Sequence, residues 1–225
     1  MSLIWQTLID IQQSFEDRFN STGTEIQEPG LERFSWYNKV WTSDRYRRAH
    51  IDVVDARETK GLWMMHCCVF PHTHNSAPIF GYDVIAGRNK ITGCFHDFSP
   101  VAKDHPMLGE FYESVKGLEW KRTRELPEWA ELIFSGNMIA ASNVKEEVEL
   151  TQIKTTVLDN LDLYLEQVSS FNGTADNVTE QQNYYCANQQ RNPHTPKVMT
   201  SLGLNEEDVR VFIQECLFPK IGDQL

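Results

Sequence analysis

The order of apolar and polar residues near the N-terminus has the period of an amphipathic helix. Between residues 3 and 19 the apolar positions fall roughly on one side: Leu3, Ile4, Leu8, Ile11, Phe15 and Phe19. No basic leader precedes them, and acidic residues follow soon after. We therefore expect a helix of the folded domain and not a signal peptide.

Residues 31–97 change to the pattern of short β-strands. The runs are rich in apolar residues, and Gly, Pro, Asn or Asp bound most of them: 32–41, 46–56, 61–70, 77–86 and 91–98. The connections are too short for a helix, which predicts consecutive antiparallel strands instead of parallel βαβ units. Because 62–70 and 78–86 are apolar on both sides, we expect a layer above and below the sheet.

The remaining chain has helical patterns that can supply those layers. Helices are predicted over 106–118, from Pro127, after Ser142, over 178–191 and from Asn205. No repeat or long linker divides the chain. The sequence therefore predicts one domain over residues 1–225 with an α/β fold, a three-layer α/β/α sandwich whose central antiparallel sheet is flanked by helices.

Charge and cysteine content narrow the classes of function. The formal net charge of −11 argues against broad binding to nucleic acid or to an anionic membrane. No apolar run approaches the ~20 residues that span a bilayer. The five cysteines form no CxxC pair, so we expect reduced thiols of a cytoplasmic protein and no iron–sulfur cluster. A monomer is the simplest expectation.

Two ionisable residues interrupt the apolar strands. Asp83 is the only acid or base within 78–86, and neighbouring Gly81 leaves room for a flat molecule. A carboxyl that loses contact with water keeps its proton to higher pH and can then act as a proton donor. The alternative is a structural Asp bonded to the backbone or to a buried base. If the strands pair as a hairpin, His66 is a cross-strand neighbour of Asp83, and His50 and Asp52 extend the same site.

Two further readings of the polar residues compete with this site. His72 and His74 suggest a metal site, with His66, His96 or Asp83 as further ligands, but both lie in a turn where solvated histidines are ordinary. We therefore predict no metal ligands. There is no GxGxxG after a strand and no P-loop, so nucleotide or flavin binding has no support.

Several segments, in order, resemble the ferredoxin-dependent bilin reductases. They are 65–71, 77–87, 97–100, 124–129, 142–144 and 185–192, and the resemblance extends over roughly 31–220. It implies an oxidoreductase of the same sandwich fold that binds biliverdin IXα between the sheet and the C-terminal helices. It also implies that the enzyme acts on CH–CH groups and receives electrons one at a time from reduced ferredoxin. The reduction would then pass through substrate radicals, with no permanently bound cofactor.

The resemblance implies roles for individual residues. Asp83 matches the central proton-donating Asp, and His66 matches the His that partners it in the phycocyanobilin-forming branch. Arg124 matches an Arg that pairs with a bilin propionate. The other predicted substrate-binding residues are His50, Asp52, Thr92, Asn192, His194 and Val198.

Two positions depart from the phycocyanobilin-forming pattern. Asp52 stands where that branch has the Glu tied to reduction of the D-ring vinyl group, and Asn192 stands where other branches carry a second catalytic Asp. The combination is similar to phage-type phycoerythrobilin synthases. It implies reduction at the 15,16 methine bridge and then at the A-ring diene, in a cyanobacterium or a phage-infected host. Formation of phycocyanobilin and a non-catalytic bilin carrier are the alternatives.

Ferredoxin is acidic, so an acidic enzyme needs local positive charge to bind it. Basic residues cluster in three places despite the net charge. We predict that some of these residues form the docking patch: Arg45, Arg47, Arg48, Arg88, Lys121 and Arg122.

Overall fold

The central element of the fold is a seven-stranded antiparallel sheet whose strands follow one another in chain order. The structure is a computed structural model and describes residues 2–170 and 177–222. The strands are β1 (Thr24–Ile26), β2 (Tyr37–Thr42), β3 (Tyr46–Ala56), β4 (Leu62–Pro71), β5 (Ile79–Gly87), β6 (Lys90–Ser99) and β7 (Ile139–Ala141). This meander confirms the predicted antiparallel connections.

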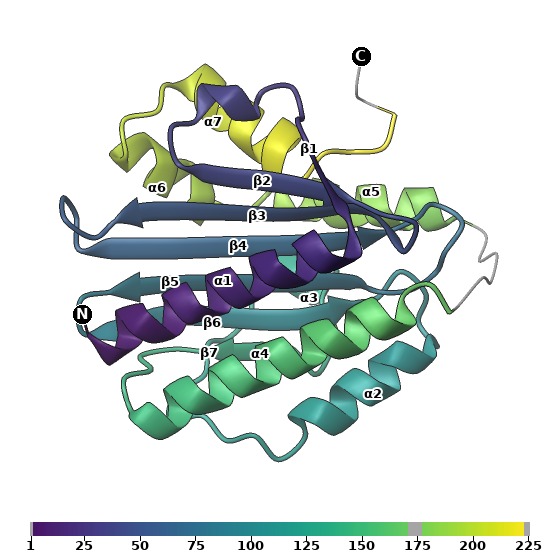
Figure 1. The fold of residues 1–225 in the computed structure, drawn as a ribbon, viewed down its shortest axis with the longest axis horizontal. Helices are drawn as coiled ribbons and strands as arrows, with labels where there is room; N and C mark the ends of the chain where they lie inside the picture. The colour runs from purple at the N-terminus through teal and green to yellow at the C-terminus, as the bar shows by residue number, and fades with distance from the viewer. Residues whose placement is uncertain (1, 171–176, 223–225) are drawn as a thin grey trace.

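Helices cover both faces of the sheet, as Figure 1 shows. One face is covered by α1 (Leu3–Thr22), α2 (Pro106–Val115) and α4 (Glu147–Gln167). The other is covered by α3 (Glu128–Glu131), α5 (Val178–Gln189), α6 (His194–Ser201) and α7 (Glu206–Val211), which continues as a π-helix at Phe212–Leu217. A 3₁₀ turn, Leu31–Arg33, precedes β2. The predicted α/β/α sandwich is confirmed.

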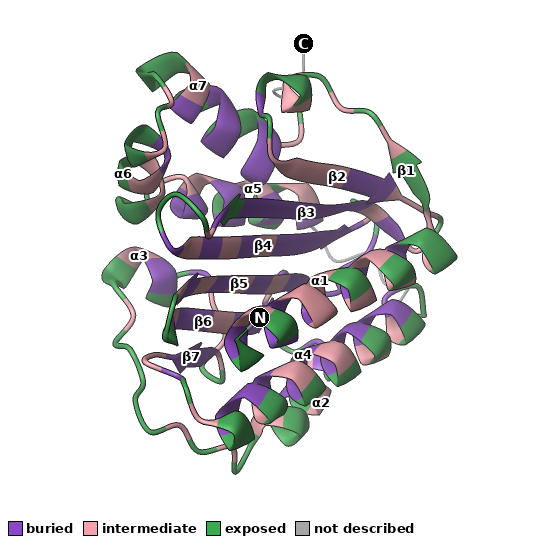
Figure 2. Cartoon of the chain, turned by 60° about the vertical axis from the view of Figure 1, so that its left-hand side comes forward, coloured by how far each residue is buried: buried purple, intermediate pink, exposed green. Residues whose placement is uncertain are grey.

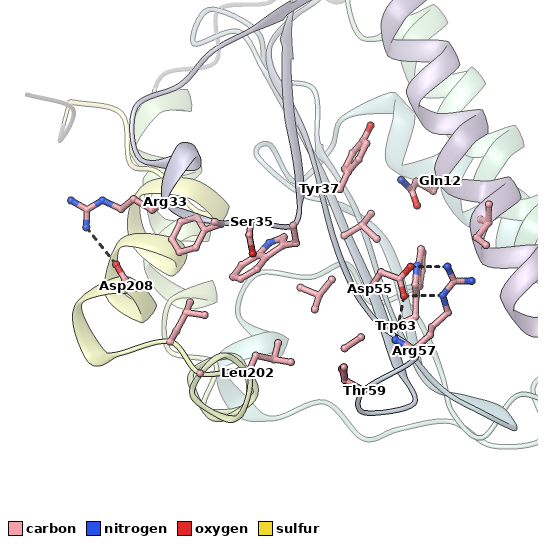
Figure 3. Close-up of a pocket in the computed structure, with 18 residues that line it drawn as sticks. Gln12, Arg33, Ser35, Tyr37, Asp55, Arg57, Thr59, Trp63, Leu202 and Asp208 are labelled. Carbon is pink, nitrogen blue, oxygen red and sulfur yellow. Dashed lines mark hydrogen bonds and ion pairs between the residues drawn. The ribbon is translucent and has the colours of Figure 1, made fainter.

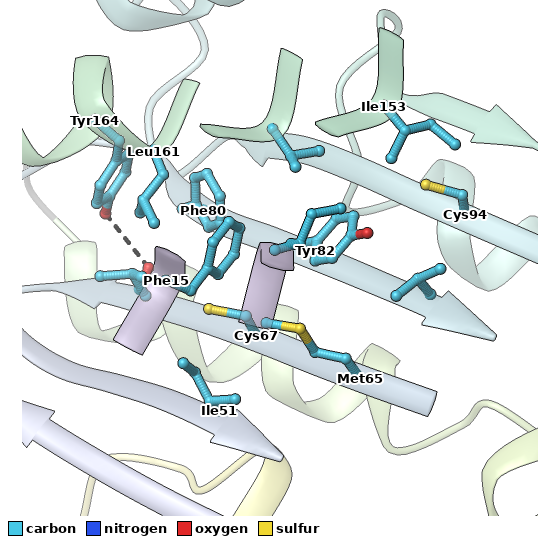
Figure 4. Packing of buried hydrophobic residues seen from close by; sticks show 14 of the residues in the cluster. Phe15, Ile51, Met65, Cys67, Phe80, Tyr82, Cys94, Ile153, Leu161 and Tyr164 are labelled. Carbon is cyan, nitrogen blue, oxygen red and sulfur yellow. Dashed lines mark hydrogen bonds between the residues drawn. The ribbon is translucent and has the colours of Figure 1, made fainter. Parts of the chain in front are cut away.

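The face under α1 and α4 is a closed apolar core. Met65, Cys67, Phe80 and Tyr82 point to this side from β4 and β5 and are almost completely buried (Figure 4). Phe15 of α1 meets them, with its ring centroid 5.9 Å from that of Phe80 and 5.5 Å from that of Tyr82. Because side chains alternate along a strand, His66, Gly81 and Asp83 point to the opposite face.

The sequence does not predict β1, β7 or α6, and each of them is short or polar. β1 and β7 have three residues each, too few to show an alternation. The helix expected after Ser142 begins at Glu147, since Asn143 adopts a left-handed conformation (φ 57°) and turns the chain. α6 follows Pro193 through a largely polar stretch that gives no helical signal. The helix expected from Pro127 is a single turn, α3.

The five cysteines are free and buried, as expected for reduced thiols. Within the described residues, no helix is both long and apolar enough to cross a membrane.

Candidate active site

A row of polar side chains crosses the middle of the sheet on the face toward the C-terminal helices. Strand register pairs Asn38 of β2 with Asp52 of β3, Asp52 with His66 of β4, and His66 with Asp83 of β5. Directly paired residues have Cβ atoms roughly 4.5–5.5 Å apart. The structure thus brings together Asp52, His66 and Asp83, as the sequence predicts.

A cavity of about 240 Å³ lies over this row. The sheet contributes Asp52, His66, Gly81 and Asp83 to its wall, and Figure 2 shows the alternation of buried and partly exposed residues along β4 and β5. The opposite wall comes from the C-terminal part of the chain and includes Tyr185, Asn192, His194, Val198, Phe212 and Phe218. Most of these walls are apolar, which favours an extended, largely hydrophobic ligand.

Asp83 faces the cavity from the centre of β5. Loss of contact with bulk water raises the pKa of Asp83 to about 7, and the positive charge of Arg124 opposes this rise. Its carboxylate has no hydrogen-bond or ion-pair partner within the residues that the structure describes. Within these residues, Asp83 is therefore not a structural Asp that the backbone or a buried base holds in place. A half-protonated carboxyl at neutral pH can donate a proton.

His66 lies beside Asp83 as a neutral imidazole. Burial, and then the charge of Arg48, lower the pKa of His66 to about 3. The edge of Phe218 covers the ring at a centroid distance of 5.2 Å. Its Nδ1 atom is buried and has no partner among the described residues. This nitrogen is available to a ligand or to a neighbouring acid.

Asp52 is the more deeply buried acid, with 3% of its surface exposed. Burial raises the pKa of Asp52 to about 8, although the indole N–H of Trp36 opposes the rise by donating to Oδ2 at 2.5 Å. His50 is fully buried and does not line the cavity. Its Nε2 lies 3.0 Å from Asn38 Oδ1, so His50 contacts the row of polar side chains without facing the cavity.

Arg124 stands exposed at the mouth of the cavity. Its NH2 group donates to the backbone oxygen of Thr92 at 2.9 Å, and the guanidinium lies over Phe95 at 5.7 Å. Thr92 is not part of the cavity wall, and its hydroxyl donates to the backbone oxygen of Ile85. The Thr92 backbone oxygen thus orients the Arg124 side chain, whose exposed guanidinium can still pair with an anionic group.

The residues predicted on the helical side reach the cavity together. Asn192, His194 and Val198 all line it, and Asn192 Oδ1 accepts from the His194 backbone N–H at 3.0 Å at the start of α6. His72 and His74 are not in this wall. Their rings stack on each other at 5.3 Å, and His72 Nε2 lies 3.0 Å from the backbone oxygen of Ser43.

Sequence reasoning missed several polar residues of the site, Trp36 and Asp97 among them. Trp36 precedes β2 in a bend, and nothing in the local pattern links it to Asp52. Asp97 of β6 lines the cavity, and it accepts hydrogen bonds from Ser99 at 2.8 Å, from the Ser135 backbone N–H at 2.9 Å and from the Ser135 hydroxyl. This network fastens the loop after α3 to the sheet. A buried acid within an apolar strand was the signal that could have found Asp97.

Of the basic residues among which we expect the ferredoxin patch, Arg48 is buried and Arg47 is half-buried, so the patch is expected among the others. Arg48 is 3% exposed and pairs with Glu28 at 2.7 Å and with the Cys216 backbone oxygen. Arg47 packs over the Phe70 ring at 4.5 Å and donates to Gln182, and burial lowers its pKa to about 10. Both lie on a strand under the C-terminal helices. The exposed Arg88, Lys121 and Arg122 stay candidates, as does Arg45, which donates to the Leu165 backbone oxygen.

Comparison with known proteins places this geometry in a family. The model of the ferredoxin-dependent bilin reductases matches residues 4–219. Phycocyanobilin:ferredoxin oxidoreductase of Synechococcus elongatus is 28% identical over 176 residues, which cover 75% of this chain and 69% of the relative. The enzyme of the same name from Synechococcus sp. strain CC9605 is 30% identical over 168 residues, with 72% and 67% covered.

Solved structures agree with this assignment. The structure of PcyX is 38% identical, with a TM-score of 0.73 over 96% of this chain and 99% of that one. Phytochromobilin synthase from tomato in complex with biliverdin is 17% identical and shares the fold, with a TM-score of 0.72 over 92% of this chain and 81% of that one. The chain belongs to the ferredoxin-dependent bilin reductases and is an oxidoreductase.

Proposed function

We propose that this enzyme reduces biliverdin IXα to phycoerythrobilin with electrons from reduced ferredoxin. The reaction adds four electrons and four protons to the substrate: two of each at the 15,16 methine bridge, and two of each at the A-ring diene. Ferredoxin delivers electrons singly, so substrate radicals lie between the two-electron stages. We place the reaction in the cytoplasm of a cyanobacterium or a phage-infected host.

The observation that carries the proposal is Asp83 at the cavity wall. Its pKa of about 7 keeps a proton available at neutral pH. His66 beside it is neutral and has an unpartnered Nδ1. A substrate radical formed in this cavity therefore meets a proton donor and a neutral imidazole that positions it. Membership of the family supplies the electron donor, and the biliverdin complex of the tomato relative supports the choice of substrate.

The remaining cavity residues suit a tetrapyrrole with two propionates. The cavity of about 240 Å³ is smaller than the ~300–1,000 Å³ of most ligand sites, so a bilin extends from it to the mouth. There the exposed guanidinium of Arg124 pairs with a propionate, since Arg offers carboxylates two parallel donors. Val198, Asn192 and His194 contact the bilin from the helical side.

The choice of product rests on Asp52 and Asn192. Asp52 is one methylene shorter than Glu, and Trp36 holds one of its oxygens. It is therefore poorly placed to protonate a vinyl group of the D ring. Asn192 cannot act as a carboxylic acid. We assign the second reduction to the A-ring diene on this basis, and we take phycocyanobilin as the alternative product.

Chromatography of the products decides between these outcomes. Biliverdin, the enzyme, ferredoxin and a reducing system are incubated without oxygen, and samples are separated over time. We expect 15,16-dihydrobiliverdin first and phycoerythrobilin last. Phycocyanobilin, or an accumulation that ends at 15,16-dihydrobiliverdin, contradicts the product and leaves the reaction class intact. A spectral shift on binding with no reduction indicates a carrier.

A further inference from the structure

Trp36 separates the catalytic cavity from a second hollow on the protein surface. This hollow, of about 800 Å³, is lined by Trp36 together with residues of β2, β3 and the α6–α7 region (Figure 3). Its charged groups are paired, as in the ion pairs of Arg33 with Asp208 and of Arg57 with Asp55. Asp52 lies on the other side, in the wall of the cavity.

The indole of Trp36 is held by two aromatic rings and by a hydrogen bond from its N–H. Its ring centroid lies 5.1 Å from that of Phe34 and 5.3 Å from that of Phe212, which meets it nearly edge-on at 85°. Its N–H donates to Asp52 Oδ2 at 2.5 Å. A ring held in this way can keep one carboxyl oxygen turned toward β2 and away from the cavity.

We propose that Trp36 is a positioning residue for Asp52, which shields this acid from the surface hollow and restrains its carboxyl group so that the D-ring vinyl group of the bilin is not protonated. The effect on product rests on the proposed function. The effect on Asp52 itself does not, because it concerns the protein without substrate.

Trp36 acts on the Asp52 proton in two opposite ways. Its N–H stabilises the charged carboxylate, because a hydrogen bond to a charged group is stronger than one to a neutral group. Its ring excludes water from the carboxyl group, which favours the neutral acid. A variant that removes only the N–H and a variant that also opens the wall should therefore move the Asp52 titration in opposite directions.

Other polar and titratable groups also face Asp52, and their titrations have to be distinguished from that of Asp52. Asp83 is the one whose own pKa, about 7, lies close to that of Asp52. The titration is therefore measured in an Asp83→Asn background. The remaining polar or titratable neighbours are Asn38 on β2, Arg48 and His50 on β3, His66 on β4 and Cys216 on the π-helix.

The test follows the infrared carbonyl band of the Asp52 carboxyl group against pH in substrate-free protein, with Asp52→Asn to assign the band. In the Asp83→Asn background, Trp36→Phe should raise the midpoint by about one pH unit, and Trp36→Ala should lower it. Trp120→Phe, in the opposite core, should leave the midpoint in place. A midpoint that neither Trp36 variant moves overturns the proposal.

A second measurement does not depend on the folding of any Trp36 variant. In protein labelled with ¹⁵N at its tryptophans and carrying Asp83→Asn, the indole proton of Trp36 should shift with pH at the Asp52 midpoint. The shift should vanish when Asp52→Asn is added. If the pH-dependent shift of the indole proton is the same with and without Asp52→Asn, the hydrogen bond on which the proposal rests is contradicted.

The consequence for the product is read separately. We expect Trp36→Phe in otherwise unchanged enzyme to raise the ratio of phycocyanobilin to phycoerythrobilin about tenfold, the ratio that corresponds to 1.4 kcal/mol. If the Asp52 midpoint moves while the product ratio stays fixed, Trp36 affects the titration of Asp52, and the proposal that it determines the product is wrong. If the enzyme forms no reduced bilin, the proposed function fails and the titration result still stands.

Discussion

Asp83→Asn is expected to lower the rate of biliverdin reduction by about 10²–10⁴-fold, the contribution of a positioned general acid. Asn has nearly the same shape as Asp, and the Asp83 carboxylate has no hydrogen-bond partner in the described part of the chain that the change would orphan. Substrate binding should therefore persist. The measurement is a single-turnover reduction of bound biliverdin, with the bilin absorption reporting both binding and reduction.

The same variant should fold at least as well as the parent. The pKa of Asp83 is raised in the folded state, so the stability that its neutral form provides is present at low pH and is lost as pH rises through about 7. At pH 8 the charged carboxylate then destabilises the fold, and Asp83→Asn should melt at a higher temperature than the parent. Near pH 4 that advantage should disappear. Asp55→Asn, on the exposed end of β3, is the matched control and should retain the rate.

A rate within threefold of the parent for Asp83→Asn would remove Asp83 from the chemistry. The proton donor would then have to be sought at Asp52 or Asp97, the two other aspartates of the cavity wall.

Gly81→Leu is expected to weaken biliverdin binding by about 10–100-fold, because a large side chain in a filled site costs roughly 1–3 kcal/mol. Gly81 lies next to Asp83 on the cavity face of β5, and its backbone passes under Tyr185. A Cβ atom built there would lie 3.6 Å from Tyr185 Oη, which is an ordinary contact. The rest of a leucine side chain has to enter the space that the bilin needs.

Gly81→Ala provides the matched control for this prediction. Alanine adds only the tolerated Cβ atom, and it removes the conformational freedom of Gly from the unfolded chain. The melting temperature should stay unchanged or rise, and the affinity for biliverdin should fall by less than threefold. Spectral titration with biliverdin measures both variants. Equal affinities for the Leu variant and the parent would show that the ligand does not lie against β5.

The sequence predicts the sheet and its polar row because both depend on local patterns. The strand runs end at Gly, Pro and Asp residues, and the hairpin register then places His66 opposite Asp83. The sequence does not predict Trp36 on Asp52, since that contact depends on how the chain before β2 bends over a neighbouring strand. The sequence does not predict the burial of Arg48 for the same reason. Its partners, Glu28 and the Cys216 carbonyl, lie 20 and 168 residues away along the chain.

The most direct test of the account counts ferredoxin electrons against bilin. Known amounts of reduced ferredoxin are mixed without oxygen with the enzyme–biliverdin complex, and both absorptions are followed to completion. The account predicts that four ferredoxin electrons are consumed for each biliverdin and that Asp83→Asn stops the consumption early. Ferredoxin oxidation no faster than in the enzyme-free control, with biliverdin bound but unchanged, would contradict it.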